Sequence, residues 1–208
     1  MTHDIADQIV GVTPALDALR RRRPVTREQL QASFDALFHP VSDEHVSQAE
    51  RELIAAFATR LAGSSDATGT FYADRALAAD PRRAAVVLAE AAEAAVEGPF
   101  GAYTEAGLQQ ENTDGERYTP SDAAAQALGD RLAAALAHTH LLVFRPREAS
   151  GSDISRLLEA GWSADGIITL SQLVSFLAFQ QRVITGLRTL AAAGFATTAA
   201  VTPEEEAA

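Results

Sequence analysis

The chain has 208 residues, a formal net charge of −11 at neutral pH and no cysteine. Hydrophobic residues make up 47% of it, which is enough to fill a core and excludes disorder of the whole chain. The absence of cysteine excludes disulfides, thiolate metal sites and peroxidases or oxidoreductases that use thiols. The acidic charge argues against a nucleic-acid partner, and the unbroken apolar runs are too short for a membrane span. A polar N-terminus without the apolar core of a signal peptide predicts a cytoplasmic protein.

One basic cluster stands out in this acidic chain. Arg20 to Arg23 follow a segment with helical spacing and directly precede Pro24. Because the C-terminus of a helix favours cations, we interpret the cluster as a solvated helix end rather than a phosphate-binding site.

From residue 25 to residue 97 the chain has helical spacing, and its segments carry start and stop signals. Thr26 with Gln29, and Ser47 with Glu50, have the spacing of capping boxes. Asp80 stands before a proline, the pattern of an N-cap followed by proline at the first helical position. We therefore predict helices over residues 25–39, 48–62, 71–79 and 81–97.

Residues 98–120 interrupt this pattern, because they are rich in Gly, Gln, Asn and acidic residues and have no helical period. A structureless segment of this length inside a domain is often functional or an interface arm. Beyond it we predict an alanine-rich helix over residues 121–138, an extended run at 141–144 and a short helix capped by Ser152.

The last and longest predicted helix runs from about residue 164 to residue 192, and Ser163 is its expected cap. Apolar side chains cover most of its circumference. We expect this helix to be buried on nearly all sides, either in the centre of a bundle or in a subunit interface.

Together these elements predict an all-α protein, a helical bundle of about seven to eight helices. We expect one main helical domain over residues 41–194, with the long loop 98–120 inside it. An N-terminal helical extension would occupy residues 1–40, and a flexible acidic tail residues 195–208.

Two segments resemble the alkylhydroperoxidase / carboxymuconolactone decarboxylase superfamily. The first is residues 47–61, which contain Arg-Glu-Leu-Ile. The second, residues 157–187, has Gly-Trp-Ser followed by a helix with Phe-Gln-Gln-Arg and Gly-Leu, and it is similar to the peroxidase-related branch. The two segments cover about a quarter of the chain and occur in the family's order. The resemblance implies a carboxymuconolactone decarboxylase-like all-α domain that assembles as a ring-like homo-oligomer, for which we expect a trimer or hexamer.

The same resemblance implies where a site would lie. The family's peroxidatic site is a Glu followed, twelve residues later, by a Cys-x-x-Cys-x-x-x-His run. Without gaps, the Glu falls on Glu52, the two cysteines on Ser64 and Ala67, and the His on Phe71. Serine and alanine cannot form a redox-active disulfide, so thiol peroxidase activity is not expected. Glu52 remains the candidate catalytic base, with Ser64 and Phe71 as candidate pocket residues.

Asp74 and Arg182 are further candidates for a pocket near Glu52. Asp74 lies where an antiparallel helix pair would bring it to the height of Glu52, and two carboxylates would suit acid–base chemistry. The alternative, which we favour, is a surface ion pair between Glu52 and Arg75, worth about 0–1 kcal/mol. Arg182 lies on the apolar last helix and needs a partner, a pocket or access to solvent.

His138 and His140 are the strongest candidates for a metal site, but they are one residue apart and no third ligand is suggested. On a helix this spacing directs two imidazoles to different faces. We therefore expect neither a metal nor a cofactor, and interpret His138 as a helix-end histidine near the negative end of the helix dipole.

Three functions follow from these observations. The first is acid–base chemistry on a small molecule in a pocket between helices, with Glu52 as the base. The second is a non-catalytic helical binding or assembly protein that keeps the oligomeric scaffold. The third, a peroxidase-related antioxidant protein, follows from the family label and is opposed by the missing cysteines. The expected partners are a second copy of the chain and a small-molecule ligand, with neither nucleic acid nor membrane.

Overall fold

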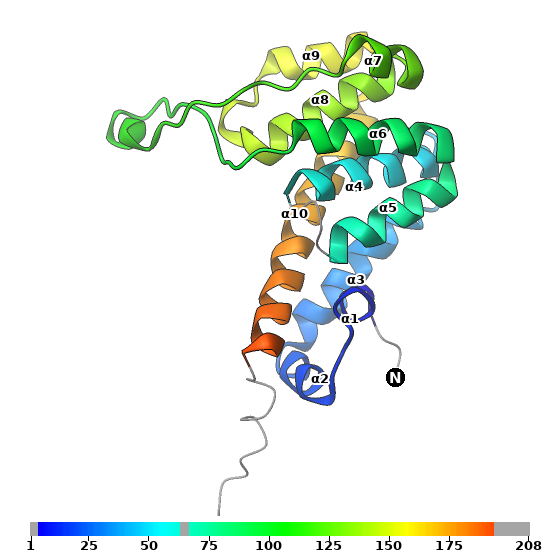
Figure 1. The fold of residues 1–208 in the computed structure, drawn as a ribbon, viewed down its shortest axis with the longest axis vertical. Coiled ribbons are helices and arrows are strands. Elements are labelled where there is room, and N and C mark those ends of the chain that lie inside the picture. Colours follow the sequence, from blue (N-terminus) through cyan, green and yellow to red (C-terminus); the bar gives the residue numbers. More distant parts are fainter. Residues whose placement is uncertain (1–3, 63–66, 194–208) are drawn as a thin grey trace, which may run out of the picture.

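A computed structural model describes residues 4–62 and 67–193, and in these residues the protein is all-α (Figure 1). The described part contains ten α-helices, two 3-10 helices and no β-strand, only a single antiparallel bridge between Gly101 and Thr113. In chain order the helices are α1 (Ile5–Val10), α2 (Pro14–Arg21), α3 (Pro24–Phe38), α4 (Gln48–Ala62), α5 (Ala67–Ala79), α6 (Pro81–Ala94), η1 (Ala106–Glu111), α7 (Asp122–Leu128), α8 (Asp130–Phe144), η2 (Pro146–Glu148), α9 (Gly151–Glu159) and α10 (Ala164–Ala192).

Helix α4 is the centre of the fold. It packs against α3, α5, α6, α8 and α10, and every residue from 51 to 59 is buried. The predicted capping box is present, since the backbone N–H of Ser47 donates to Glu50 (2.8 Å) and that of Glu50 to Ser47 Oγ (3.3 Å). Leu53, Ile54 and Phe57 are fully buried, so the apolar stripe forms the core, as predicted.

Within one chain helix α10 is not buried on all sides and does not lie in the centre of the bundle, whereas its expected burial in a subunit interface stays a prediction. One face packs on α4, α8 and α1, whereas Ile168 and Phe179 are 56% and 44% exposed. By length and composition α10 is apolar enough to cross a membrane, but core helices share this property, and half of its most apolar stretch is buried. The apolar circumference therefore marks a helix with one covered face and one open face.

Several boundaries differ from those predicted from sequence, so the helices outnumber the seven to eight expected. Gly129, with φ of +80°, separates α7 from α8. Residues 141–144 continue α8 and are not extended, because Phe144 packs against Phe100 and His140. The structure assigns the N-cap of α9 to Ser150 rather than Ser152.

The start of α3 also differs from the prediction. Thr26 lies in its first turn rather than at its cap, and the helix begins at Pro24 with no side-chain cap. Proline needs no N–H partner at this position, so the helix can start before the polar pair.

The N-terminal helices α1 and α2 are held to α3 by a buried ion cluster. The guanidinium of Arg20 donates to both oxygens of Asp4 (2.8 Å each) and to Asp7, and Arg27 contacts the same two carboxylates. The side chain of Arg20 is only 8% exposed. The interpretation of this segment as a solvated helix end is therefore wrong for Arg20.

Residues 98–120, here called the arm, leave the helical body between α6 and α7 and project away from it (Figure 1). Residues 104–117 are exposed throughout, and η1 forms the tip. The base of the arm is fixed, since the backbone N–H of Phe100 donates to the carbonyl of Phe144 (2.7 Å). Residues 195–208, predicted as a flexible tail, lie outside the described residues.

Candidate functional site

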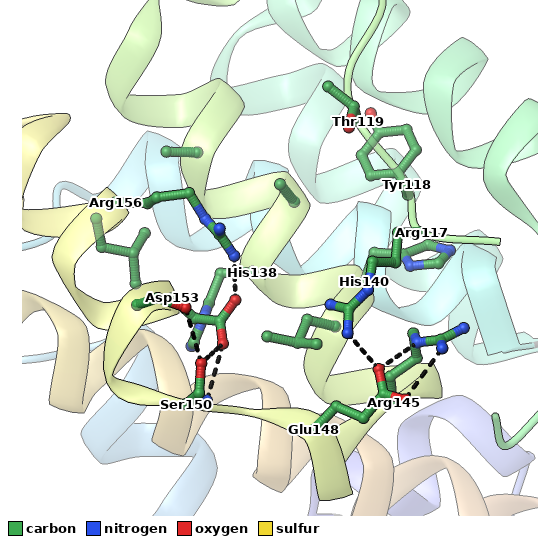
Figure 2. A pocket seen from close by; sticks show the side chains of 15 residues that line it. Arg117, Tyr118, Thr119, His138, His140, Arg145, Glu148, Ser150, Asp153 and Arg156 are labelled. Atoms are coloured by element: carbon green, nitrogen blue, oxygen red, sulfur yellow. Dashed lines mark hydrogen bonds and ion pairs between the residues drawn. The ribbon is translucent and has the colours of Figure 1, made fainter. Parts of the chain in front are cut away.

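A cavity of about 540 Å³ lies between α8, α9 and the base of the arm (Figure 2). We call it the α8–α9 pocket. Its apolar wall includes Leu141 from α8 and Leu157 from α9. Its polar groups are two histidines, three arginines, two carboxylates and several hydroxyls, so the lining is more polar than that of a typical small-molecule pocket.

His138 is the most unusual side chain in this pocket. It lies in the middle of α8 and is 6% exposed. Neither of its ring nitrogens has a hydrogen-bond partner among the described residues. Because leaving a buried polar group unpaired costs about 1–3 kcal/mol, such a group calls for a functional explanation.

The protonation of His138 is set by its surroundings. Burial lowers the pKa of the imidazole, Asp153 opposes this shift and Arg156 adds to it. His138 is therefore neutral at pH 7, with one nitrogen able to donate a hydrogen bond and the other able to accept one.

Asp153 is the N3 residue of the capping box at the start of α9, and Ser150 is its N-cap. It accepts hydrogen bonds from the backbone N–H (2.8 Å) and the hydroxyl (2.7 Å) of Ser150, and it pairs with Arg156. Burial alone would raise the pKa of Asp153, but these hydrogen bonds and the nearby arginine lower it. The carboxylate is therefore ionised and well satisfied, and the N-terminus of α9 lies at the pocket wall.

Glu148 organises the opposite end of the pocket. Its carboxylate accepts from Arg145 Nε (2.7 Å), Arg117 Nη2 (2.5 Å) and the backbone N–H of Ala102 (3.1 Å). The hydrogen bond from Arg145 is the main reason why its pKa is lowered. Gly101 is required beside it, because its φ is +114° and a Cβ there would lie 2.9 Å from Glu148 Oε1. Glu148 thus ties the base of the arm to the helical body.

A second, smaller cavity of about 230 Å³ lies on the other side of the arm base, and Tyr118 and His140 line both cavities. Glu90 from α6 accepts hydrogen bonds there from the Tyr118 hydroxyl (2.6 Å) and the Ser121 hydroxyl (2.7 Å). Burial and the Glu90 carboxylate raise the pKa of Tyr118, which stays protonated. Residues 117–119 therefore form a fixed partition between the two cavities.

Glu52, the residue predicted as a catalytic base, lies elsewhere. It is 4% exposed and accepts from Arg75 Nε (2.9 Å) and Nη2 (2.5 Å) and from Gln48 (2.6 Å). The Arg75 guanidinium also lies 5.3–5.5 Å from the ring centres of three phenylalanines, Phe34, Phe38 and Phe71. The ion pair favoured from sequence is therefore present, but its carboxylate is buried rather than on the surface, and the Arg75 side chain is 27% exposed.

The other sequence-predicted residues do not gather around Glu52. Phe71 is near it, as a wall of the Arg75 site. Asp74 is exposed, and Arg182 is exposed on α10, where it donates to the carbonyl of Ala178 in its own helix (2.8 Å). Ser64 lies outside the described residues. Neither of the two cavities described above is lined by Glu52, Asp74 or Arg182.

Within residues 4–62 and 67–193, no group of three or more His, Asp or Glu side chains has a geometry that would hold a metal ion. His138 and His140 both lie on α8, but only His140 faces the second cavity. The groups of this site that can contact a ligand are therefore its histidine and its arginines.

Comparison of the chain with models of known protein families, with curated proteins and with solved structures finds no match. The site must therefore be interpreted from its own geometry.

The α8–α9 pocket was missed by sequence reasoning because α8 was predicted to stop too early. A helix ending at residue 138 makes His138 a terminal residue, whereas the continuation through residues 141–144 places it mid-helix. One signal in the sequence could have indicated the longer helix: apolar residues lie on both sides of His138, as they would if a single helix continued through it. The contributions of α9 and the arm could not be found from local sequence.

Proposed function

We propose that the protein binds a small molecule in the α8–α9 pocket and exchanges a proton or a hydrogen bond with it through His138. The observation that carries this proposal is the buried imidazole whose two ring nitrogens have no protein partner among the described residues. Natural proteins rarely keep such a group unless it has a role. The proposal keeps the acid–base function expected from sequence and transfers its central residue from Glu52 to His138.

The chemistry follows from the neutral imidazole. A histidine with a lowered pKa is neutral at pH 7, so its unprotonated ring nitrogen can act as a general base toward a bound molecule. Asp153 lies close enough to stabilise the imidazolium that would form, since it raises the pKa of His138. Glu52 is less suited to this role, because its two oxygens are held by Arg75 and Gln48.

The substitution His138→Leu tests this proposal through opposite effects on stability and binding. Leucine has a similar volume and no unpaired nitrogens, so the free energy of unfolding should rise by about 1 kcal/mol. Binding should be lost at the same time, because the proposal requires an imidazole nitrogen, closed to solvent in this structure, to turn toward the ligand. The measurements are thermal unfolding and ligand-observed NMR with a panel of small carboxylates, phosphate esters, amines and alcohols.

The control is His39→Leu, since His39 is exposed, lies outside the pocket and contacts Asp35 and the ring edge of Phe34. It should leave the panel binding unchanged and the stability within about 0.5 kcal/mol. If His138→Leu destabilises the protein and binds the same panel members as the unsubstituted chain, then His138 is a core residue and the proposal fails.

The second proposed function is assembly, and the exposed face of α10 is the observation that favours it. Ile168 and Phe179 are large apolar residues open to solvent on the face of α10 that points away from the core. We propose that this face joins copies of the chain into a homo-oligomer. The likeness of residues 47–61 and 157–187 to the carboxymuconolactone decarboxylase-like superfamily supports the same proposal, because that family assembles through helical packing.

Light scattering at micromolar concentration tests the assembly. We expect an oligomer, and we expect Phe179→Asp to shift it toward the monomer, because burying a charge without a partner is costly. Leu77→Asp on α5 is the matched control, since Leu77 is 41% exposed on another helix. A monomeric unsubstituted protein would contradict the assembly and leave the pocket proposal standing.

A further inference from the structure

We infer that the α8–α9 pocket takes a small organic oxyanion, a carboxylate or a phosphate monoester, held between Arg156 and Arg117 and against His138. This inference rests on the proposed function and names the class of ligand for the same pocket. Its support comes from charge, from unused donors and from the position of a helix N-terminus.

The charge of the pocket is opposite to that of the chain. Three guanidinium groups, those of Arg117, Arg145 and Arg156, line the cavity together with the carboxylates of Glu148 and Asp153. With both histidines neutral, the lining has an excess of one positive charge, although the whole chain carries −11. A local positive site in an acidic protein selects anions from solution.

Two of the three arginines keep donors free for a ligand. Arg117 contacts Glu148 through Nη2 alone, and Arg156 contacts Asp153 through Nη2 alone. Their side chains are 58% and 65% exposed, so the remaining N–H groups are accessible at the mouth. Arg145 differs, since it uses Nε and both terminal nitrogens on Glu148 and Gly115. Guanidinium groups bind planar or tetrahedral oxyanions in preference to neutral groups.

The carboxylates of the pocket do not repel an incoming anion strongly. Glu148 accepts four hydrogen bonds, from Arg145, Arg117 and the Ala102 N–H, and Asp153 accepts from Ser150 and Arg156. Their charges are thus already balanced within the protein. Helix α9 begins at this wall, through Ser150 and Ser152, and a helix N-terminus favours negative charge.

His138 lies on the buried side of the pocket, and a rotation of its ring would turn a nitrogen, closed to solvent in this structure, toward a bound ligand. Figure 2 shows the imidazole beside Asp153 and Ser150 and below the Arg156 guanidinium, at the end of the cavity away from Glu148 and Arg145. A neutral imidazole donates one hydrogen bond, and an oxyanion is the acceptor that pairs best with it. The carbon part of the ligand would then contact Leu141 and Leu157.

Isothermal titration calorimetry on the full chain at low ionic strength tests this inference, with four probes of matched size: benzoate, phenyl phosphate, benzamide and benzylamine. We expect at least one of the two anions to bind about tenfold or more tightly than the neutral amide and the amine. Higher affinity for benzoate or for phenyl phosphate tells which oxyanion the pocket prefers. Raising the salt concentration should lower the affinity for the anion, because the arginines at the mouth of the pocket are exposed and salt screens their charge.

Arg156→Gln and Arg117→Gln should each lower the affinity for the preferred anion about tenfold and leave the affinity for benzamide unchanged. Arg182→Gln on α10 is the matched control and should change nothing, since Arg182 contacts only its own helix. Benzamide or benzylamine binding as tightly as the anions, or arginine variants without effect, would overturn the oxyanion inference and keep the proposed pocket. Absence of binding by all four probes would overturn both.

Discussion

Replacing Arg75 with methionine should lower the free energy of unfolding by about 3–5 kcal/mol. The substitution leaves the Glu52 carboxylate 4% exposed, with Gln48 as its remaining side-chain hydrogen-bond partner among the described residues, and such a charge is costly. It also removes the cation from the rings of Phe34, Phe38 and Phe71. Chemical denaturation followed by circular dichroism measures the loss.

Two comparisons make this result specific. Arg83→Met is the control, because Arg83 is 47% exposed and pairs with Asp80 at 3.4 Å, so the loss should stay below about 1 kcal/mol. The double substitution Glu52→Leu with Arg75→Met should recover part of the loss, because no charge is then left buried. A loss for Arg75→Met no larger than that for Arg83→Met would show that the pair does not hold the fold.

Replacing Arg20 with methionine should cost about 3 kcal/mol, because it takes the main partner from two buried carboxylates. Arg27 would then be the remaining arginine partner of Asp4 and Asp7 among the described residues. Since α1 packs against α3, α5 and α10, the first effect should be release of the N-terminal helices, seen as faster hydrogen exchange in residues 4–23.

The same cluster predicts how stability depends on pH. Hydrogen bonds from Arg21 and Arg27 lower the pKa of Asp17 to about 2, and the pKa of Asp4 is also lowered, because its arginine partners outweigh the effect of burial. A carboxylate with a depressed pKa stabilises the fold above its ordinary value, near 3.9, and this contribution is lost as pH falls toward the lowered value. Protection of residues 4–23 should therefore fall between about pH 4 and pH 2. Protection that is unchanged across this range, or by Arg20→Met, would contradict the role given to the cluster.

Local signals were sufficient for the framework of the fold. The Ser47–Glu50 pair, the Asp80 cap and the Ser163 cap each mark a helix start that the structure confirms. These signals work because their hydrogen bonds span three residues and do not depend on the rest of the chain. The all-helical class followed from the same local spacing.

Long-range contacts account for what the sequence did not reveal. The four apolar residues 141–144 have no periodicity of their own, and packing of Phe144 on Phe100 makes them helical. Arg20 is part of a basic run, yet its partners Asp4 and Asp7 lie 16 and 13 residues earlier. The pocket combines α8, α9 and the arm, so no single segment carries its signature.

Helix α10 shows the limit of amphipathicity as a guide. Its apolar circumference predicted burial on nearly all sides, in the centre of the bundle or in a subunit interface, and within one chain the residues from 51 to 59 of α4 hold the central position. Alanine and threonine on α4 permit close packing of five neighbouring helices without a strongly apolar sequence. The open face of α10 is the basis of the proposed assembly.

The most direct test of the pocket is NMR of the protein with ¹⁵N-labelled histidine, recorded against pH with and without benzoate or phenyl phosphate. The His138 signals are assigned by their loss in His138→Leu. Without ligand, His138 should titrate below the ordinary histidine pKa of about 6.5, because burial opposes its charge. A bound oxyanion favours the imidazolium, so it should shift the ring nitrogens and raise this pKa, while exposed His39 stays unchanged. Signals of His138 that titrate at the ordinary pKa and do not respond to either anion would contradict the account.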